Sequence, residues 1–94
     1  MKRITRADLD GAVDLLNRIA GTPTRPYRFG SLAANIGNYH LDGAYGGWAL
    51  HQMADESGDV RDIFNMGHMP ARELYNLIHA YRKGMETRQE LETA

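Results

Sequence analysis

The sequence predicts an α+β fold in the order α-β-β-β-α: a three-stranded antiparallel meander with two helices packed on one of its faces. Apolar residues recur at helical spacing near both ends of the 94-residue chain. Between them, residues 35–64 alternate apolar and polar side chains as strands do, and two turn clusters divide this stretch into three. We expect one domain over residues 1–94, with termini that fray at 1–4 and 85–94.

The first helix is predicted from about Arg6 to Ala20. Thr5 is a good N-cap, because its hydroxyl can accept a hydrogen bond from the free N–H of Asp8. Gly21 is suited to the position that follows the last helical turn. We expect Gly11, which weakens a helix, to allow close packing of the backbone. One face of this helix is apolar and consists of Leu9, Ala12, Val13, Leu16, Ile19 and Ala20.

Residues 21–34 form a long connection with two prolines three residues apart, which favour an extended path. Tyr27 and Phe29 alternate with Arg28 in this segment. Two interpretations stay open: either the connection is a mobile or functional segment, or Tyr27 and Phe29 close the core.

Three strands are expected within residues 36–41, 48–53 and 60–64. The first turn is centred on Asp42-Gly43 or on Gly46-Gly47, and these two registers pair different residues. The second turn lies in residues 55–59.

The stretch 39–48 contains the only tryptophan, and we interpret it mainly as a scaffold. Glycines allow the chain to reverse tightly. We expect Tyr39, Leu41 and Trp48 to attach the sheet to the helices, and the opposite face of the sheet to be open to solvent or to a partner.

The second helix is predicted to begin at Pro70, a favoured first helical residue, and to end before Gly84. Arg82 and Lys83 suit its last turn, because positive charge near a helix C-terminus is favourable. Its apolar stripe consists of Leu74, Leu77, Ile78, Tyr81 and Met85.

Composition excludes several classes of protein. The absence of cysteine excludes disulfides, thiol catalysis and cysteine-type zinc sites. No apolar run follows the basic first residues as in a secretion signal, and none approaches the roughly 20 residues of a membrane span. We expect a cytoplasmic protein with no membrane partner.

No set of residues with catalytic spacing is present. The only serines, Ser31 and Ser57, lie outside a nucleophile-elbow motif. Four histidines occur, and His40 and His51 fall on adjacent predicted strands, but none has the helical i, i+4 spacing of a metal pair. We therefore expect no enzyme activity, no catalytic residues, no cofactor and no metal.

Charge is unevenly distributed although the net charge is −1. The first 41 residues are basic, and residues 42–62 are acidic. Arginines interleave with aromatic residues near residue 27, a pairing that binds phosphates and stacks bases. One alternative is therefore a nucleic-acid-binding domain, with candidate residues Lys2, Arg3, Arg6, Arg25 and Arg28.

The element order resembles that of the double-stranded-RNA-binding domain. The resemblance stops at topology, because that family has a lysine cluster at the start of its last helix. Here the corresponding stretch offers only Arg72 beside Glu73.

Protein binding is the preferred hypothesis, because the chain has no coherent catalytic set but has an aromatic-rich hairpin and a sheet face that we expect to be open. The expected partner is a host or phage protein, and a homodimer formed through the sheet is a further alternative. The candidate partner-binding residues are Tyr45, Arg25, Tyr27, Arg28 and Phe29.

The run from Gly37 to Leu50, with its Ala-Tyr-Gly-Gly-Trp core, and the later Arg-Glu-Leu-Tyr at 72–75 resemble small uncharacterised proteins encoded by temperate phages and prophages of proteobacteria. The resemblance covers most of residues 22–84. It implies a phage genomic context and no catalytic residues. We therefore expect a small phage-type accessory protein in the cytoplasm of the host cell.

Overall fold

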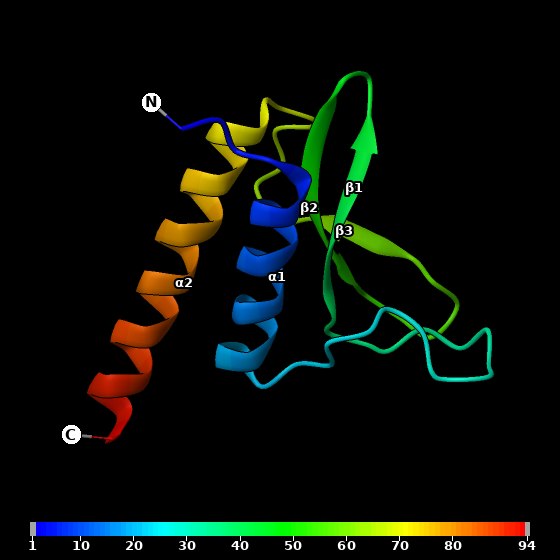
Figure 1. Cartoon of the computed structure of the whole chain (residues 1–94). Coiled ribbons are helices and arrows are strands. Elements are labelled where there is room, and N and C mark those ends of the chain that lie inside the picture. Colours follow the sequence, from blue (N-terminus) through cyan, green and yellow to red (C-terminus); the bar gives the residue numbers. More distant parts are fainter. Residues whose placement is uncertain (1, 94) are drawn as a thin grey trace.

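Two helices cover one face of a three-stranded antiparallel sheet in the computed structural model, which describes residues 2–93 (Figure 1). This confirms the predicted α+β fold and its order. The strands lie in the order β1-β2-β3 across the sheet. The elements are α1 (Arg6–Ala20), β1 (Tyr39–Ala44), β2 (Gly47–Met53), β3 (Val60–Asp62) and α2 (Ala71–Thr93).

Helix α1 has the predicted boundaries and caps. The Thr5 hydroxyl accepts from the Asp8 N–H, and the Asp8 carboxylate accepts from the Thr5 N–H, which completes a capping box. Gly21 ends the helix with a φ of 73°. The expectation for Gly11 was wrong, because a Cβ placed there would meet no atom within 4 Å.

Helix α2 does not end before Gly84 but continues to Thr93. A glycine inside a helix costs only about 1 kcal/mol, because it keeps its backbone hydrogen bonds. Two contacts support the longer helix. Arg82 pairs with Glu86 across Gly84, and beyond it the Gln89 side chain donates to the Ile19 carbonyl of α1 at 3.0 Å. Residues 85–93 are thus helical rather than frayed. Met1 and Ala94 lie outside the described residues.

The β1–β2 turn is centred on Tyr45-Gly46, between the two centres that the sequence allowed. Ala44 pairs with Gly47, and His40 pairs with His51. Both turn residues have positive φ, 53° at Tyr45 and 73° at Gly46. Two residues of positive φ are the pattern of a type I′ turn, whose twist matches that of the strands on either side.

The strands begin and end at other residues than expected. β1 begins at Tyr39, and Ile36 lies before it with 55% of its surface exposed. β3 ends at Asp62 rather than at residue 64. The Asp62 carboxylate accepts the N–H groups of Asn65 and Gly67, at 3.2 and 3.1 Å. These bonds form a turn, so the chain leaves the sheet there.

The core lies between the helices and the sheet. Tyr39 is buried in it, and Leu41 and Trp48 pack against it, as expected. The opposite face is not open along its whole length, because Ala49 and Met53 are buried there, on the side of β2 away from Leu50. The buried core cluster consists of Leu9, Val13, Leu16, Tyr39, Leu50, Met69, Leu74 and Ile78.

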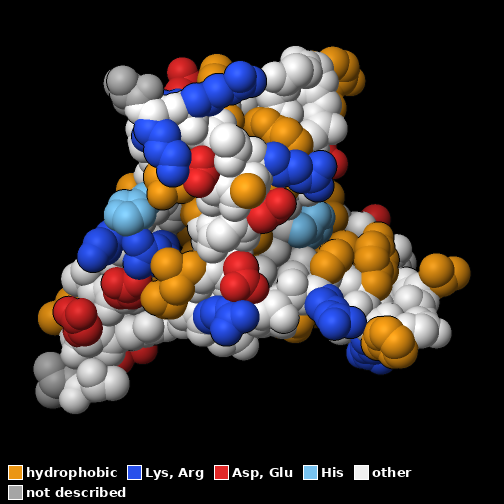
Figure 2. Space-filling model, in the orientation of Figure 1, with side chains coloured by type: hydrophobic (Ala, Val, Ile, Leu, Met, Phe, Trp, Pro, Cys, Tyr) orange, Lys and Arg blue, Asp and Glu red, His pale blue; other side chains and the backbone are white. Residues whose placement is uncertain are grey.

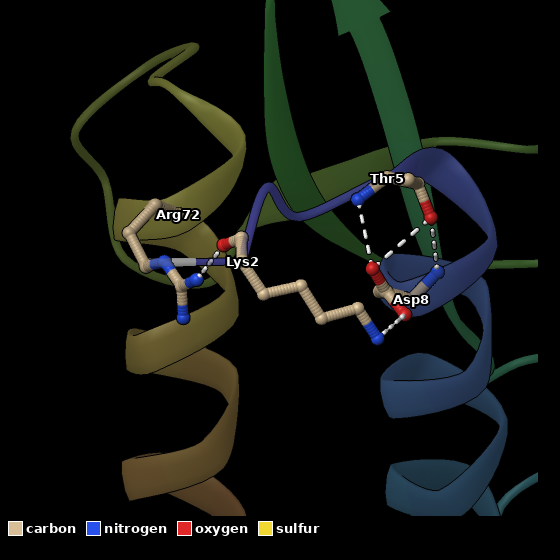
Figure 3. A network of polar contacts seen from close by, with 4 residues as sticks. All are labelled: Lys2, Thr5, Asp8 and Arg72. Carbon is tan, nitrogen blue, oxygen red and sulfur yellow. Dashed lines mark hydrogen bonds and ion pairs between the residues drawn. The ribbon is translucent and has the colours of Figure 1, made fainter.

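The starts of the two helices are tied together by the N-terminal segment (Figure 3). Arg72 at the start of α2 donates to the carbonyl of Lys2, and the Lys2 ammonium lies 3.8 Å from the Asp8 carboxylate at the start of α1. The Thr5–Asp8 hydrogen bonds lower the pKa of Asp8. No helix within residues 2–93 is long and apolar enough to cross a membrane.

Candidate functional site

Residues 25–36, which we call the arm, project from the sheet side of the molecule as a small hairpin (Figure 1). Tyr27 and Ala34 form an antiparallel bridge, the Arg28 N–H donates to the Ala33 carbonyl at 3.0 Å, and the Asn35 N–H donates to the Pro26 carbonyl at 2.8 Å. These bonds give the arm a defined backbone.

The arm is held against the β2–β3 turn. Ala34 is fully buried, and its N–H donates to the Glu56 carbonyl at 3.0 Å. The Arg28 guanidinium lies 3.4 Å from the Glu56 carboxylate. The arm therefore has a fixed base, with its tip in solvent.

Large apolar side chains at the tip of the arm are almost wholly exposed. Phe29 is 91% exposed and Leu32 is 94% exposed. Tyr27 is 48% exposed. Of the two interpretations of this segment, closing of the core is therefore wrong for Phe29, and the segment is a surface structure. Figure 2 shows hydrophobic and Lys/Arg side chains gathered at the corner that the arm occupies.

One of the two arginines of the arm lies beside this apolar tip, and the other, Arg28, is paired with Glu56. The Arg25 guanidinium carbon is 6.0 Å from the centre of the Phe29 ring, within the range of a cation–π contact. Residues 21–36 contain these two arginines and no acidic residue. The arm is thus an apolar surface with positive charge at its edge.

The remaining predicted basic residues lie elsewhere. Lys2, Arg3 and Arg6 line a depression that also includes Trp48 and Arg72, at the start of both helices. Arg6 lies over the Trp48 ring at 5.3 Å. The 15 residues of α1, a length of about 22 Å at 1.5 Å per residue, separate this group from the arm. Figure 1 shows the N-terminal segment at the start of α1 and the arm beyond its other end, so the five candidate residues for nucleic acid form two groups and not one patch.

Tyr45 lies at the tip of the β1–β2 hairpin and is 97% exposed. Its ring contacts His68 edge to face, with ring centres 5.7 Å apart. It is therefore separate from the arm and next to a group of histidines.

A histidine face, composed of His40, His51, His68 and Asp42, occupies the side of the sheet away from the helices. His40 on β1 is paired with His51 on β2, and their ring centres are 6.0 Å apart. His68, from the loop before α2, lies 6.4 Å from His51. The His68 Nε2 is 2.6 Å from an Asp42 carboxylate oxygen.

Electrostatics within the histidine face follow from these contacts. The hydrogen bond from His68 lowers the pKa of Asp42. Burial is the main cause that lowers the pKa of His40, and the neighbouring His51 lowers it further. The carboxylate is therefore charged and the His40 imidazole is neutral at neutral pH.

Sequence reasoning placed His40 and His51 on adjacent strands but missed His68 and Asp42. These two residues are 26 positions apart, and no local pattern connects them. If the register of β1 on β2 had been predicted correctly, it would have placed His40 directly opposite His51. The approach of His68 depends on the path of the 63–69 loop.

Comparison of the chain with protein-family models, with curated proteins and with solved structures gave no match.

Proposed function

We propose that this protein is a non-catalytic binding protein whose arm docks into an apolar pocket, edged by acidic residues, on another protein. The observation that carries the proposal is the exposure of Phe29 and Leu32 at 91% and 94% on a hydrogen-bonded hairpin. Leaving such side chains in water forgoes burial free energy of roughly 1.5–3 kcal/mol each, which a partner can recover.

Preorganisation supports this function. The bridge at Tyr27 and the bonds to Glu56 fix the arm before it meets a partner, so little conformational entropy remains to be lost on binding. Aromatic residues and arginine are also enriched among the residues that dominate binding energy. Arg25, next to the Phe29 ring, supplies positive charge that would attract an acidic rim.

The resemblance of residues 37–50 to small phage proteins supports a more specific form of the proposal. In that form the protein is a phage-type accessory protein, and its partner is a host or phage protein in the host cytoplasm. Tyr45, exposed at the far hairpin tip, offers a second contact for a large partner.

A crosslinking experiment tests the proposal. A photoreactive phenylalanine analogue at position 29 should trap a host or phage protein, whereas the same analogue at position 91 should not. Leu91 is a matched control, because it is 73% exposed but lies on α2. Phe29→Ala and Leu32→Ala should then weaken binding of the trapped protein. Equal trapping from both positions would refute the proposal that the arm is the surface that binds the partner.

Nucleic acid is the second candidate, and one observation favours it: the exposed Phe29 ring lies 6.0 Å from the Arg25 guanidinium carbon, and Arg28 precedes Phe29 in the sequence. The separation of Lys2, Arg3 and Arg6 from the arm favours the protein partner. A gel-shift assay at low salt, with Arg25→Ala/Arg28→Ala as the test and Lys83→Ala as the control, distinguishes the two. Salt-sensitive binding that requires the two arginines would support nucleic acid instead.

A further inference from the structure

Strand β1 forms one edge of the sheet, because it pairs with β2 alone in the described part of the chain, residues 2–93 (Figure 1). In an antiparallel pair, successive residues direct their N–H and C=O groups alternately toward the neighbouring strand and away from it. Tyr39 directs its groups away from β2, because the Asn17 side chain bonds both of them at 2.9 Å. The period of two therefore directs the backbone groups of Leu41 and Gly43 outward as well.

The hydrogen bonds of β2 agree with this direction. Trp48, the residue opposite Gly43, exchanges both of its backbone hydrogen bonds with Met69 at 2.9 Å. The carbonyl of Leu50, opposite Leu41, accepts an N–H from the segment that follows β3 at 3.0 Å. These β2 residues thus use their backbone groups on the side away from β1.

The outward N–H and C=O groups of Leu41 and Gly43 form no hydrogen bond with any other group of residues 2–93. Gly43 is exposed and Leu41 is half-buried, so a partner can reach this edge. Asn17 shows which chemistry fits, because its amide accepts from and donates to Tyr39 as the backbone of a neighbouring strand would. An extended backbone beside β1 would continue from Asn17 and satisfy the four free groups of two residues.

The helix side of this edge favours apolar side chains on such a strand. A hollow of about 520 Å³ lies there, and Leu41, Gly43 and Trp48 are among the residues that line it. Residues directly opposite each other in an antiparallel pair share a face of the sheet. The residues of an added strand opposite Leu41 and Gly43 would therefore point into the hollow, next to the Trp48 ring.

The other side of the edge favours a basic side chain. The residue between those two would lie opposite Asp42, whose side chain is 45% exposed and whose pKa is lowered by the hydrogen bond from His68. Opposite charges directly across a pair are favourable, and like charges are unfavourable. A second copy of this chain, paired antiparallel through both Leu41 and Gly43, would place Asp42 opposite its own copy. The charge therefore favours a different partner.

We propose that the outward edge of β1 binds an extended segment of another protein by strand addition at Leu41 and Gly43. The segment alternates apolar, basic and apolar residues, with the basic residue opposite Asp42. Its pairing is antiparallel, the more stable of the two ladders. The inference does not rest on the function proposed for the arm.

The synthetic peptide acetyl-Thr-Val-Lys-Val-Thr-amide tests the edge by NMR of the isotope-labelled, full-length protein. Without peptide, the amides of Leu41 and Gly43 should exchange rapidly with water, whereas that of Asp42, which faces β2, should exchange slowly. The peptide should slow exchange at Leu41 and Gly43 and shift their resonances. The resonances of His79, on α2, should stay in place.

The matched control is the same peptide with both valine nitrogens methylated. Methylation removes the two donors that would face β1 and keeps the side chains, so it should weaken binding roughly tenfold or more. Because the change is in the peptide, the fold of the protein is unaltered. Equal binding of the two peptides, or no binding of either, would overturn the proposal.

Asp42→Asn tests the charge pair. The parent protein should bind the lysine peptide roughly threefold or more tightly than its glutamate analogue, and Asp42→Asn should bind the two about equally. Glu90→Gln, an exposed change on α2, should keep the preference of the parent. A preference that persists in Asp42→Asn would contradict the proposed register.

Sedimentation of the free protein distinguishes the partner from a second copy. The parent protein should remain monomeric at the concentrations used for NMR. If it dimerises and its Leu41 and Gly43 amides are protected without peptide, a second copy occupies the edge and the proposal is wrong.

Discussion

The ring of Trp48 lies directly against Gly43, its partner across the β1–β2 ladder. A Cβ at Gly43 would be 2.8 Å from Trp48 Cζ3, closer than real Cβ atoms approach. Gly47, which precedes Trp48 in the sequence, also has no room for a side chain, because a Cβ there would be 2.9 Å from the Met69 carbonyl oxygen. The glycines of this hairpin therefore make room for the tryptophan and for the bridge between Trp48 and Met69.

Gly43→Ala is expected to displace the Trp48 ring and to lower the free energy of unfolding by about 1–3 kcal/mol, the usual cost of overpacking. Trp48 is the only tryptophan, so its fluorescence reports both the displacement and the unfolding transition. An unchanged emission maximum and an unchanged denaturation midpoint would contradict the proposed contact.

Gly11→Ala is expected to act in the opposite direction. The site is inside α1 and a Cβ there meets open space, so the substitution should stabilise the protein by about 1 kcal/mol. Chemical denaturation followed by circular dichroism measures the change. A loss of stability would mean that the backbone at residue 11 packs against something after all.

Tyr45→Asn is expected to stabilise the hairpin while weakening a partner interaction. Tyr45 has a φ of 53°, a conformation that costs most side chains roughly 1–2 kcal/mol but that asparagine tolerates. Thermal unfolding should show a higher midpoint. If the partner identified by crosslinking binds this variant as well as the parent protein, Tyr45 is only a turn residue.

Asn17→Ala is expected to be among the most destabilising single changes. The Asn17 side chain is 1% exposed; it donates to the Tyr39 carbonyl and accepts from the Tyr39 N–H, both at 2.9 Å. Its loss leaves two backbone groups of the edge strand unpaired in the core, at a cost of about 2–4 kcal/mol. Asn76→Ala, on the exposed side of α2, is the control and should be nearly neutral in urea denaturation.

Alkaline pH is expected to destabilise the fold through Tyr39. Burial, with the hydrogen bond to the Tyr81 hydroxyl, raises the pKa of Tyr39 to about 12. A folded pKa above the unfolded value of about 10 means that stability is retained below pH 10 and lost as pH rises toward 12.

The phenolate absorbance near 295 nm measures this titration directly. One of the five tyrosines should ionise about two pH units after an ordinary tyrosine. The late step should be absent in Tyr39→Phe and retained in Tyr75→Phe, the control. A late step that persists in Tyr39→Phe would assign it to another residue.

The accuracy of the predictions differed between the two helices for a physical reason. The boundaries of α1 follow from Thr5 and Gly21, because capping is a local interaction between residues three or four positions apart. The end of α2 did not follow from Gly84, because the contact between Gln89 and α1 is long-range.

The amino-acid sequence by itself determined the fold class, both helix starts and the number of strands, since periodicity and capping act locally. Only the tertiary structure decided the register of β1 on β2. A turn centred on Gly46-Gly47 would place His40 opposite Met53, whereas the observed turn places it opposite His51. The sequence allowed neither this turn nor its register, and a shift of two residues in the pairing decides whether His40 and His51 lie opposite each other.

The same distinction holds for the arm. The sequence identified residues 25–29 as candidates, but it could not determine whether Phe29 is buried or exposed. Exposure depends on how the hairpin at Tyr27 and Ala34 anchors against Glu56, a contact between segments about 20 residues apart. Such long-range packing, which no local pattern encodes, places both the arm and the histidine face on the molecular surface.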